Sequence, residues 1–199
     1  MLIVIEGIDG SGKTTQAKLL YEALKDRGYK VALLYEPTDS KYGLLIREKL
    51  KTGDYTPLEL YELFLKDREI NAVRIRKLMS ENMIVILDRY YISTIAYQGA
   101  QGIPISKIIR DHAKMPRPDI IFILDMEPEY ALMRIGSRDT FEKVDFLRRV
   151  RDLYLRVPEI LEDICSDIYI IDAMGRPEQI HEEILGIVLR KLSEVDSSA

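Results

Sequence analysis

A short glycine-rich segment near the N-terminus constrains the fold of this chain more than any other feature. The apolar run 2–5 passes directly into Gly7-Ile-Asp-Gly-Ser-Gly-Lys-Thr14, which matches the pattern G-x-x-x-x-G-K-[ST]. In this pattern, glycines let successive backbone N–H groups turn toward an anion, and the dipole of the following helix adds positive charge. The segment therefore predicts a buried strand, a phosphate-binding loop and a helix, in that order.

The side chains of this loop indicate a nucleotide-phosphate site. We expect Lys13 to supply a positive charge to the outer phosphates and the Thr14 hydroxyl to reach a Mg²⁺ ion. The alternative is a flexible turn, but the loop lies between a strand-like run and a helix-like segment, as phosphate binding requires. The residues expected to bind the phosphates are Gly7, Ile8, Asp9, Gly10, Ser11, Gly12, Lys13, Thr14 and Thr15.

Composition narrows the functional classes. The 199 residues, 47% hydrophobic and 31% charged, suit one globular domain, which we expect over 1–194 with a disordered tail at 195–199. The net charge of −4 argues against a broad nucleic-acid surface. Apolar runs are too short for a membrane span and the N-terminus does not resemble a signal peptide, so we expect a cytoplasmic protein. The single cysteine, Cys165, is expected to be packed rather than catalytic.

Strand-like and helix-like segments alternate along the chain. Apolar runs predict strands at 2–6, 30–35, 83–87, 120–124 and 168–171. Helices are expected at 13–27, 44–50, 57–80, 92–99, 105–114, 128–135, 144–161 and 177–192. This alternation predicts a parallel sheet covered on both faces, with ligands bound beyond the carboxyl ends of its strands. The rule places the glycine-rich loop, Glu36, Asp88–Tyr90, Asp125 and Asp172 in or beside one crevice.

Three further motifs carry candidate chemistry, each with a plainer alternative. Asp88-Arg89 follows an apolar strand and could hold Mg²⁺ and a second phosphate, or could be a capping acid and a surface arginine. Phe64 and Arg68 share a helix face and could stack on a base and bond its edge, although spacing alone favours a core Phe and a surface Arg. Tyr97-Gln98 could extend that site or simply end a helix.

Basic residues gather between 134 and 151. Arg134 and Arg138 lie in a break between helices, which could be a lid that delivers a guanidinium group or a solvated loop. A solvated face is preferred for Arg148, Arg149 and Arg151. Glu142-Lys-Val-Asp145 superficially matches the guanine-reading pattern N-K-x-D. It lacks the Asn and does not follow an apolar strand, so a GTPase switch is not expected.

With these residues in order, the chain resembles the thymidylate kinases, a family of P-loop nucleoside monophosphate kinases. The most specific block is Asp88-Arg-Tyr-Tyr-Ile-Ser-Thr-Ile-Ala-Tyr-Gln-Gly99, supported by the loop, Glu36-Pro37, residues 64–68, Pro118-Asp119, Leu124-Asp125 and Ile171-Asp172-Ala173. The resemblance implies a three-layer α/β P-loop NTPase-type fold, with a five-stranded parallel sheet in the order 2-3-1-4-5, and a homodimer. It also implies phosphoryl transfer from ATP to thymidine 5′-monophosphate (dTMP), with Mg²⁺, in dTTP biosynthesis.

The resemblance assigns roles to individual residues. Catalytic roles fall to Lys13, Arg89, Arg138 and Asp9, and Mg²⁺ ligation to Thr14 and Asp88. Arg134 would lie near the adenine. In the acceptor site, Phe64 would stack on thymine, Arg68 would bond it and Tyr97 would crowd the 2′ position of the sugar. The full set expected to bind the acceptor is Asp9, Glu36, Arg47, Phe64, Arg68, Arg89, Thr94, Tyr97 and Gln98.

Two departures from the family pattern matter. Thr38-Asp39-Ser40 stands where many relatives have Gly-Gly-Thr, and no arginine occurs among residues 8–11. The lid, at about 134–143, must then supply the catalytic arginine, and Arg138 is our hypothesis. Two other functions remain open: a P-loop kinase for a different acceptor, and a non-catalytic nucleotide sensor. The intact Lys13 and Arg89 argue against the sensor.

Overall fold

A parallel five-stranded sheet forms the centre of the molecule. The computed structural model describes residues 1–136 and 141–197, with the backbone alone for 141–142 and 195–197. The strands are β1 (Leu2–Gly7), β2 (Val31–Tyr35), β3 (Ile84–Asp88), β4 (Ile120–Asp125) and β5 (Ile168–Asp172). They pair in parallel in the order β2-β3-β1-β4-β5, which confirms the predicted fold and strand order.

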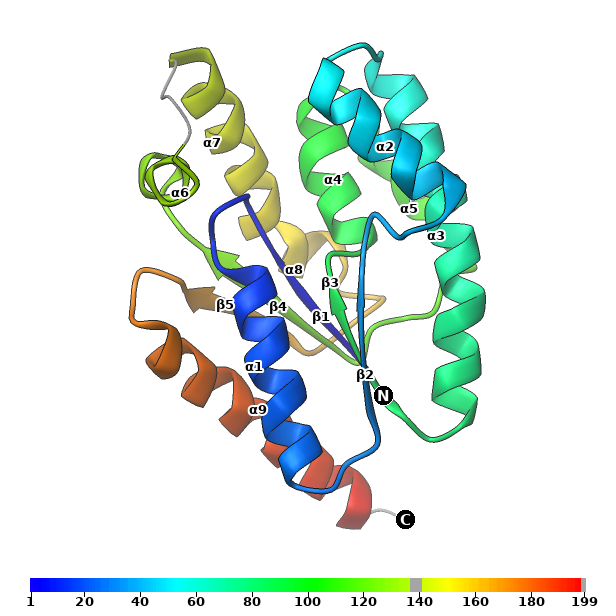
Figure 1. Cartoon of the computed structure of the whole chain (residues 1–199), viewed down its shortest axis with the longest axis vertical. Helices are drawn as coiled ribbons and strands as arrows, with labels where there is room; N and C mark the ends of the chain where they lie inside the picture. Colours follow the sequence, from blue (N-terminus) through cyan, green and yellow to red (C-terminus); the bar gives the residue numbers. More distant parts are fainter. Residues whose placement is uncertain (137–140, 198–199) are drawn as a thin grey trace.

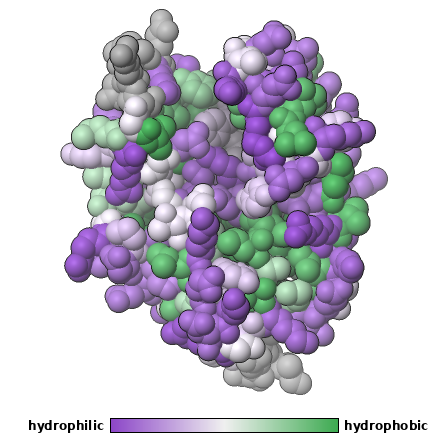
Figure 2. Space-filling model, in the orientation of Figure 1, coloured by the Kyte–Doolittle hydropathy of each residue, from purple (hydrophilic) through white to green (hydrophobic). Residues whose placement is uncertain are grey.

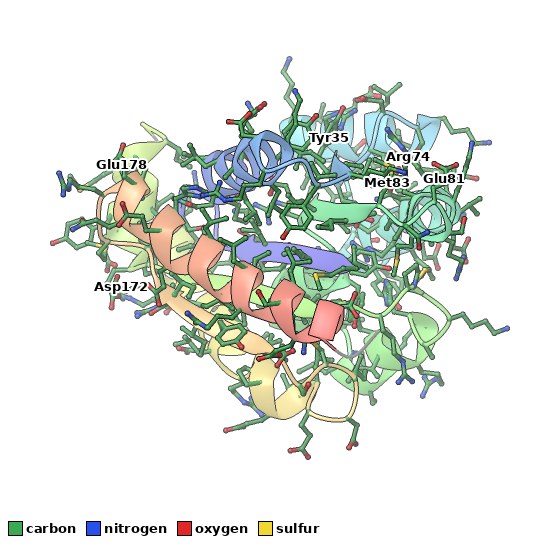
Figure 3. All side chains as sticks on the ribbon, turned by 90° about the horizontal axis from the view of Figure 1, so that it is seen from below. Tyr35, Arg74, Glu81, Met83, Asp172 and Glu178 are labelled. Carbon is green, nitrogen blue, oxygen red and sulfur yellow. The ribbon has the colours of Figure 1, made fainter. Side chains whose placement is uncertain are left out.

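The strands are continuously apolar because helices cover both faces of the sheet. Every residue of β1 and β3 is buried, as is β4 up to Leu124, whereas the edge strands β2 and β5 are partly exposed. Figure 3 shows Tyr35 and Asp172, which end the two edge strands, on opposite sides of the molecule. The three central strands therefore form the rigid core from which the loops at their carboxyl ends project.

Helices form the two outer layers. They are α1 (Lys13–Asp26), α2 (Lys41–Thr52), α3 (Pro57–Ser80), α4 (Tyr91–Ala100), α5 (Ile105–Asp111), α6 (Pro128–Arg134), α7 (Phe141–Leu155), α8 (Val157–Ile160) and α9 (Pro177–Ser197). Helices α1 and α9 lie side by side on one face, and α4 and α7 pack together behind the sheet (Figure 1). Among the described helices, none is both long and apolar enough to cross a bilayer.

Local chemistry explains where helix boundaries differ from the prediction. Helix α2 begins earlier than expected because the Ser40 hydroxyl accepts the N–H groups of Tyr42 and Gly43. The predicted helix 144–161 is two helices, since Pro158 has no N–H to continue the ladder. Helix α9 continues to Ser197, into the segment expected to be a tail, and 198–199 lie outside the described residues. Cys165 is buried, as predicted.

The molecule is hollowed at the carboxyl end of the sheet. Figure 2 shows a depression between the α2–α3 side of the molecule and the α6–α7 side. Two cavities, of about 960 and about 270 Å³, lie in this region. Both are lined by residues from the loops that follow β1, β2 and β3.

Candidate active site

The loop between β1 and α1 has the backbone of an anion cradle. Gly7, Gly10 and Gly12 have φ of +143°, +88° and +98°, values that L side chains rarely adopt. A Cβ at Gly10 would also lie 2.3 Å from the Ala131 carbonyl oxygen of α6. Glycine is therefore required at Gly10, a variable position of the motif, both by backbone conformation and by the close approach of α6.

Lys13 lies under this loop rather than in solvent. Its side chain is 6% exposed, and its ammonium donates a 2.7 Å hydrogen bond to the Ile8 carbonyl. Burial, together with the nearby charge of Arg89, lowers the pKa of Lys13 to about 7. A phosphate placed in the loop would favour the charged ammonium and raise that pKa.

The side chains of Thr14, in the first turn of α1, and Asp88, at the end of β3, are in contact. The Thr14 hydroxyl donates a 2.5 Å hydrogen bond to Asp88 Oδ2, and Asp88 is 9% exposed. The two side chains present hard oxygen atoms side by side, which suits Mg²⁺ with its other ligands from water and phosphate. Among the described residues, no group of three or more His, Cys, Asp or Glu side chains forms a metal cage.

The larger cavity begins at this loop and extends toward α9. Its walls include the loop residues from Asp9 to Thr15, Gly175 and Pro177. Arg134, at the end of α6, also lines it and donates to the Ala173 carbonyl at 3.2 Å. The cavity is large enough for a nucleoside triphosphate whose phosphates occupy the loop and whose base lies near Arg134.

The smaller cavity has apolar walls and a few polar groups. Its apolar lining comes from Leu50, Tyr55, Leu60, Phe64, Tyr97 and Phe146, and its polar lining from Arg68, Arg89, Ser93, Thr94, Gln98 and Gln101. Four residues line both cavities: Asp9, Glu36, Pro37 and Arg89. The two spaces therefore adjoin at the carboxyl ends of β1, β2 and β3, where groups bound in each would meet.

Arg89 and Asp9 form an ion pair at this junction. Arg89 Nη2 donates to Asp9 Oδ1, Nη1 donates to Ser93 Oγ at 3.1 Å, and the guanidinium lies 5.6 Å from the centre of the Tyr97 ring. The Tyr97 hydroxyl accepts the Asp9 N–H at 3.1 Å. Burial alone would raise the pKa of Asp9. The charges of Arg89 and Lys13 outweigh this effect, so the pKa of Asp9 is lowered. Two basic side chains, Lys13 and Arg89, thus lie at a junction that also holds the carboxylates of Asp9, Glu36 and Asp88.

Arg68 is buried, contrary to the surface arginine that spacing alone favoured. The residue is 1% exposed, and its Nε donates to Glu36 Oε2 at 2.7 Å. Asn71 donates to the other Glu36 oxygen at 3.0 Å, and Arg68 Nη1 donates to Thr94 Oγ1 at 3.0 Å. Both Glu36 oxygens therefore have protein donors, and Glu36 orients Arg68 at the cavity wall. Phe64, one turn earlier on α3, is half-buried in the same cavity.

Arg47 lies on the side of the larger cavity. Its guanidinium donates to the Pro37 carbonyl at 2.7 Å and to Asp39 at 2.8 Å. The unusual Thr38-Asp39-Ser40 loop is anchored by Asp67, which accepts from Thr38 N, Thr38 Oγ1 and Ser40 Oγ at 2.6–2.7 Å. Asp67 was not anticipated. The one signal in the sequence is that Asp67 lies between Phe64 and Arg68, the two residues of α3 that are predicted to bind the acceptor.

The structure also places Asp125 and Asp172, which were expected in or beside the crevice, and Glu6, which was overlooked. Asp125 forms two bonds to Arg151, at 2.7 and 2.9 Å, so Arg151 is not the solvated residue predicted and Asp125 lines neither cavity. Asp172 also lines neither cavity and accepts the Met174 N–H. Arg138 lies outside the described residues. Glu6 was missed, although an acid within an apolar strand was a detectable signal.

Glu6 is completely buried beneath the junction. Its carboxylate accepts Tyr90 N at 2.6 Å, Ser93 N at 3.2 Å, Ser93 Oγ at 2.6 Å and the Tyr154 hydroxyl at 3.0 Å. Burial raises the pKa of Glu6 despite these donors. The network ties α4 and α7 to β1 and supports the segment that carries Arg89.

Comparison with known proteins identifies the family. The family model described as thymidylate kinase matches residues 5–184. The chain belongs to the thymidylate kinase family. It is 43% identical to a probable thymidylate kinase of Archaeoglobus fulgidus, with 94% of each chain covered. It is 36% identical to the thymidylate kinase of Xylella fastidiosa strain M12, over 96% of this chain and 88% of the relative.

A solved structure agrees with this assignment. The crystal structure of thymidylate kinase from Ehrlichia chaffeensis superposes with a TM-score of 0.78 and 30% sequence identity, covering 94% of this chain and 98% of the other. The recognition made from ordered motifs is thereby confirmed at the level of family and fold. The glycine-rich loop and residues of the 88–99 segment line two cavities that adjoin.

Proposed function

We propose that this protein transfers the γ-phosphoryl group of ATP to dTMP, yielding ADP and thymidine 5′-diphosphate for dTTP biosynthesis. Family membership supports the reaction, and one structural observation carries it: a loop built for phosphates adjoins an aromatic cavity at Asp9 and Arg89. In the transfer, an oxygen of the acceptor phosphate bonds to the γ-phosphorus while the bond to the ADP oxygen breaks. We also propose a cytoplasmic location, where ATP is at hand.

On the donor side, we assign the ATP phosphates to residues 7–15 and the adenine to the end of the cavity near Arg134. The backbone N–H groups and Lys13 neutralise phosphate charge, which is the main requirement of phosphoryl transfer. Thr14 and Asp88 would hold Mg²⁺, directly or through water, and the ion would screen the charge that develops on the phosphates.

On the acceptor side, we assign the thymine to the smaller cavity. Phe64 offers a ring face for stacking, and Arg68 with Gln98 offers donors to the base edge. Tyr97 stands over Arg89 and would leave little room for a 2′-hydroxyl, which favours deoxyribose. Arg89 would bind the acceptor phosphate, with Arg47 on the larger-cavity side, and Asp9 would contact the 3′-hydroxyl or the phosphate network. Thr94 is buried, and its hydroxyl supports the site by accepting a hydrogen bond from Arg68.

We propose that the protein is a homodimer joined through the outer side of α3. Ile70 and Val73 lie one turn apart on this helix and are 47% and 66% exposed, an unfavourable state for large apolar side chains. Helix α4 is a poor candidate for the interface, because Ile92, Ile95 and Ala96 are all completely buried in the core of the single chain.

A direct assay tests the proposed reaction. Purified protein is incubated with Mg²⁺, ATP and dTMP, and ADP release is followed by a coupled enzyme while mass spectrometry detects thymidine 5′-diphosphate. We expect product only when all three are present. Competition with UMP, AMP or gluconate tests the choice of acceptor, and a preference for any of these would overturn it. No ADP above background would favour a nucleotide sensor.

A further inference from the structure

The guanidinium of Arg68 has a third anchor, His112, which lies outside the acceptor cavity. Arg68 Nη1 is 2.8 Å from His112 Nε2, in addition to its bond to Thr94, while Nε is occupied by Glu36. Among the side chains that the structure describes, none accepts a hydrogen bond from Nη2. Two of the three nitrogens are therefore held by the protein, and Nη2 remains to donate to a ligand.

The proton arrangement on His112 follows from its second partner. His112 Nδ1 lies 2.7 Å from the Ile108 carbonyl oxygen, which can only accept, so Nδ1 carries the proton. Nε2 then has a free lone pair and accepts from Arg68. Burial and the charge of Arg68 lower the pKa of His112 to about 3, so the ring stays neutral at physiological pH.

The imidazole is held in a fixed plane. Its ring stacks on Tyr91, with centroids 5.4 Å apart and an angle of 27°, and meets the edge of Tyr61 at 6.4 Å. His112 is 4% exposed and borders a separate cavity of about 230 Å³ behind the site, whereas it does not line the acceptor cavity. Any effect of His112 on a bound base must therefore pass through Arg68.

We propose that His112 is a positioning residue for base recognition: it fixes the plane of the Arg68 guanidinium so that Nη2 points at the C4 carbonyl oxygen of the pyrimidine. A hydrogen bond from Arg68 Nε to Glu36 alone would leave the guanidinium free to rotate about that hydrogen bond. The acceptor His112 and the hydroxyl of Thr94 on Nη1 remove this freedom. The inference rests on the proposed function, because it assumes that the base occupies the cavity lined by Arg68.

Two substitutions separate the hydrogen bond from the shape of the ring. His112→Phe keeps an aromatic ring against Tyr91 but removes the acceptor, and His112→Gln keeps an acceptor oxygen near the position of Nε2. We expect His112→Phe to raise KM for dTMP at least about tenfold, the usual cost of losing a charged hydrogen bond. Its kcat and its KM for ATP should stay within about twofold, and His112→Gln should restore most of the loss.

Base discrimination gives a readout that a purely structural role would not move. 5-Methyl-2′-deoxycytidine 5′-monophosphate keeps the methyl group but presents an amino donor where thymine has a carbonyl. His112→Phe should reduce the preference for dTMP over this analogue, because only dTMP loses a bond to Arg68. An equal loss for both nucleotides, or an unchanged KM for dTMP, would overturn the proposal. If the wild-type protein forms no thymidine 5′-diphosphate, the proposed function fails instead.

A measurement on the unmodified protein guards against a variant that does not fold. The chain has only two histidines, so a long-range ¹⁵N–¹H spectrum of labelled protein contains two imidazole patterns, which His181→Asn assigns. We expect the Nδ1–H tautomer for His112. Observation of the Nε2–H tautomer would overturn the proposal, because that nitrogen could not accept from Arg68.

Discussion

Charged side chains at the junction of the two cavities shift one another's pKa values. Lys13 is buried and Arg89 is partly buried, and Asp9 forms ion pairs with both. Positive charge held in place before phosphate arrives costs stability in the free protein, and it needs no rearrangement when the reaction occurs. Lys13 shows the consequence most directly, since its pKa lies near neutrality.

We expect ATP binding at about pH 8 to be accompanied by proton uptake. Lys13 has a pKa of about 7 in the free protein, and phosphate raises it, so binding takes up a proton between the two values. Affinity should accordingly weaken as pH rises through this window. Calorimetry of ATP binding in buffers of different ionisation enthalpy measures the uptake. Lys13→Met should abolish it, and heats that are independent of buffer in the wild type would contradict the assignment.

Arg138 is expected to be the residue with the largest effect on kcat among the lid arginines. The P-loop has no arginine at 8–11, and arginine fingers contribute about a thousandfold or more to phosphoryl transfer. Arg138→Ala should therefore lower kcat at least about a hundredfold in a steady-state ADP assay. The matched control is Arg148→Ala, an exposed arginine paired with Glu129, which should change kcat less than about twofold. A kcat for Arg138→Ala within about twofold of wild type would refute the hypothesis.

At the scale of elements, α2 depends on a close approach to the loop after β2. Gly43 in its first turn faces Thr38, and a Cβ there would lie 1.9 Å from the Thr38 carbonyl oxygen. The same loop is tied to α3 by the three bonds to Asp67. The position of α2, which carries Arg47 and Leu50 to the cavities, is thus set by a glycine contact and a buried carboxylate.

Gly43→Ala should lower stability and raise KM for dTMP, because α2 or the loop must move to admit the methyl group. We expect a loss of about 1–3 kcal/mol in the free energy of unfolding, as in other overpacked sites. Gly186→Ala is the control: this residue lies within α9, where the nearest atom to a new Cβ is Arg190 Nη1 at 3.7 Å. Alanine there should stabilise by about 0.5–1 kcal/mol. Denaturant unfolding of both variants measures the two changes in the free energy of unfolding. A Gly43→Ala variant that is more stable than the wild type would contradict the packing argument.

At the scale of the whole molecule, the site is built at the carboxyl end of the sheet by helices from both sides. Helices α3 and α4 line the smaller cavity, proposed for the acceptor. Helices α1, α6 and the start of α9 line the larger one, proposed for ATP, and α2 contributes to both. Phe146 of α7 reaches the acceptor cavity and contacts Tyr97 with ring centres 6.3 Å apart. The helix that follows the proposed lid therefore contributes to the wall of the smaller cavity.

The proposed homodimer can be tested without disturbing that site. Val73→Asp places a charge on the exposed apolar side of α3 and should convert the protein to a monomer in analytical ultracentrifugation. Met133→Asp is the matched control, since Met133 on α6 is equally exposed, at 68%, but lies on another part of the surface. A dimer that survives Val73→Asp, or a wild-type monomer, would rule out this interface.

The fold was predictable because its signals are local. The loop motif, the continuous apolar strands and the helical periodicities each involve residues within one element, and together they implied the parallel sheet. The acceptor roles of Arg89, Thr94, Tyr97 and Gln98 rest on the family block around Asp88 and stay predictions. By spacing alone, Arg68 was expected at the surface, because a four-residue interval does not reveal which partners surround a helix face.

What the sequence determined by itself is the strand, glycine loop and helix at residues 2–27 and the order of elements that follow. These features follow from backbone conformation and from the burial of nearby apolar residues, and both are properties of a single segment. Only the tertiary structure decided which charges are buried and paired. The hydrogen bonds of Arg68 with Glu36 and His112, of Asp125 with Arg151, and of Glu6 with Ser93 join residues 26 to 87 positions apart. Such pairs depend on how elements pack together, and no local pattern specifies that.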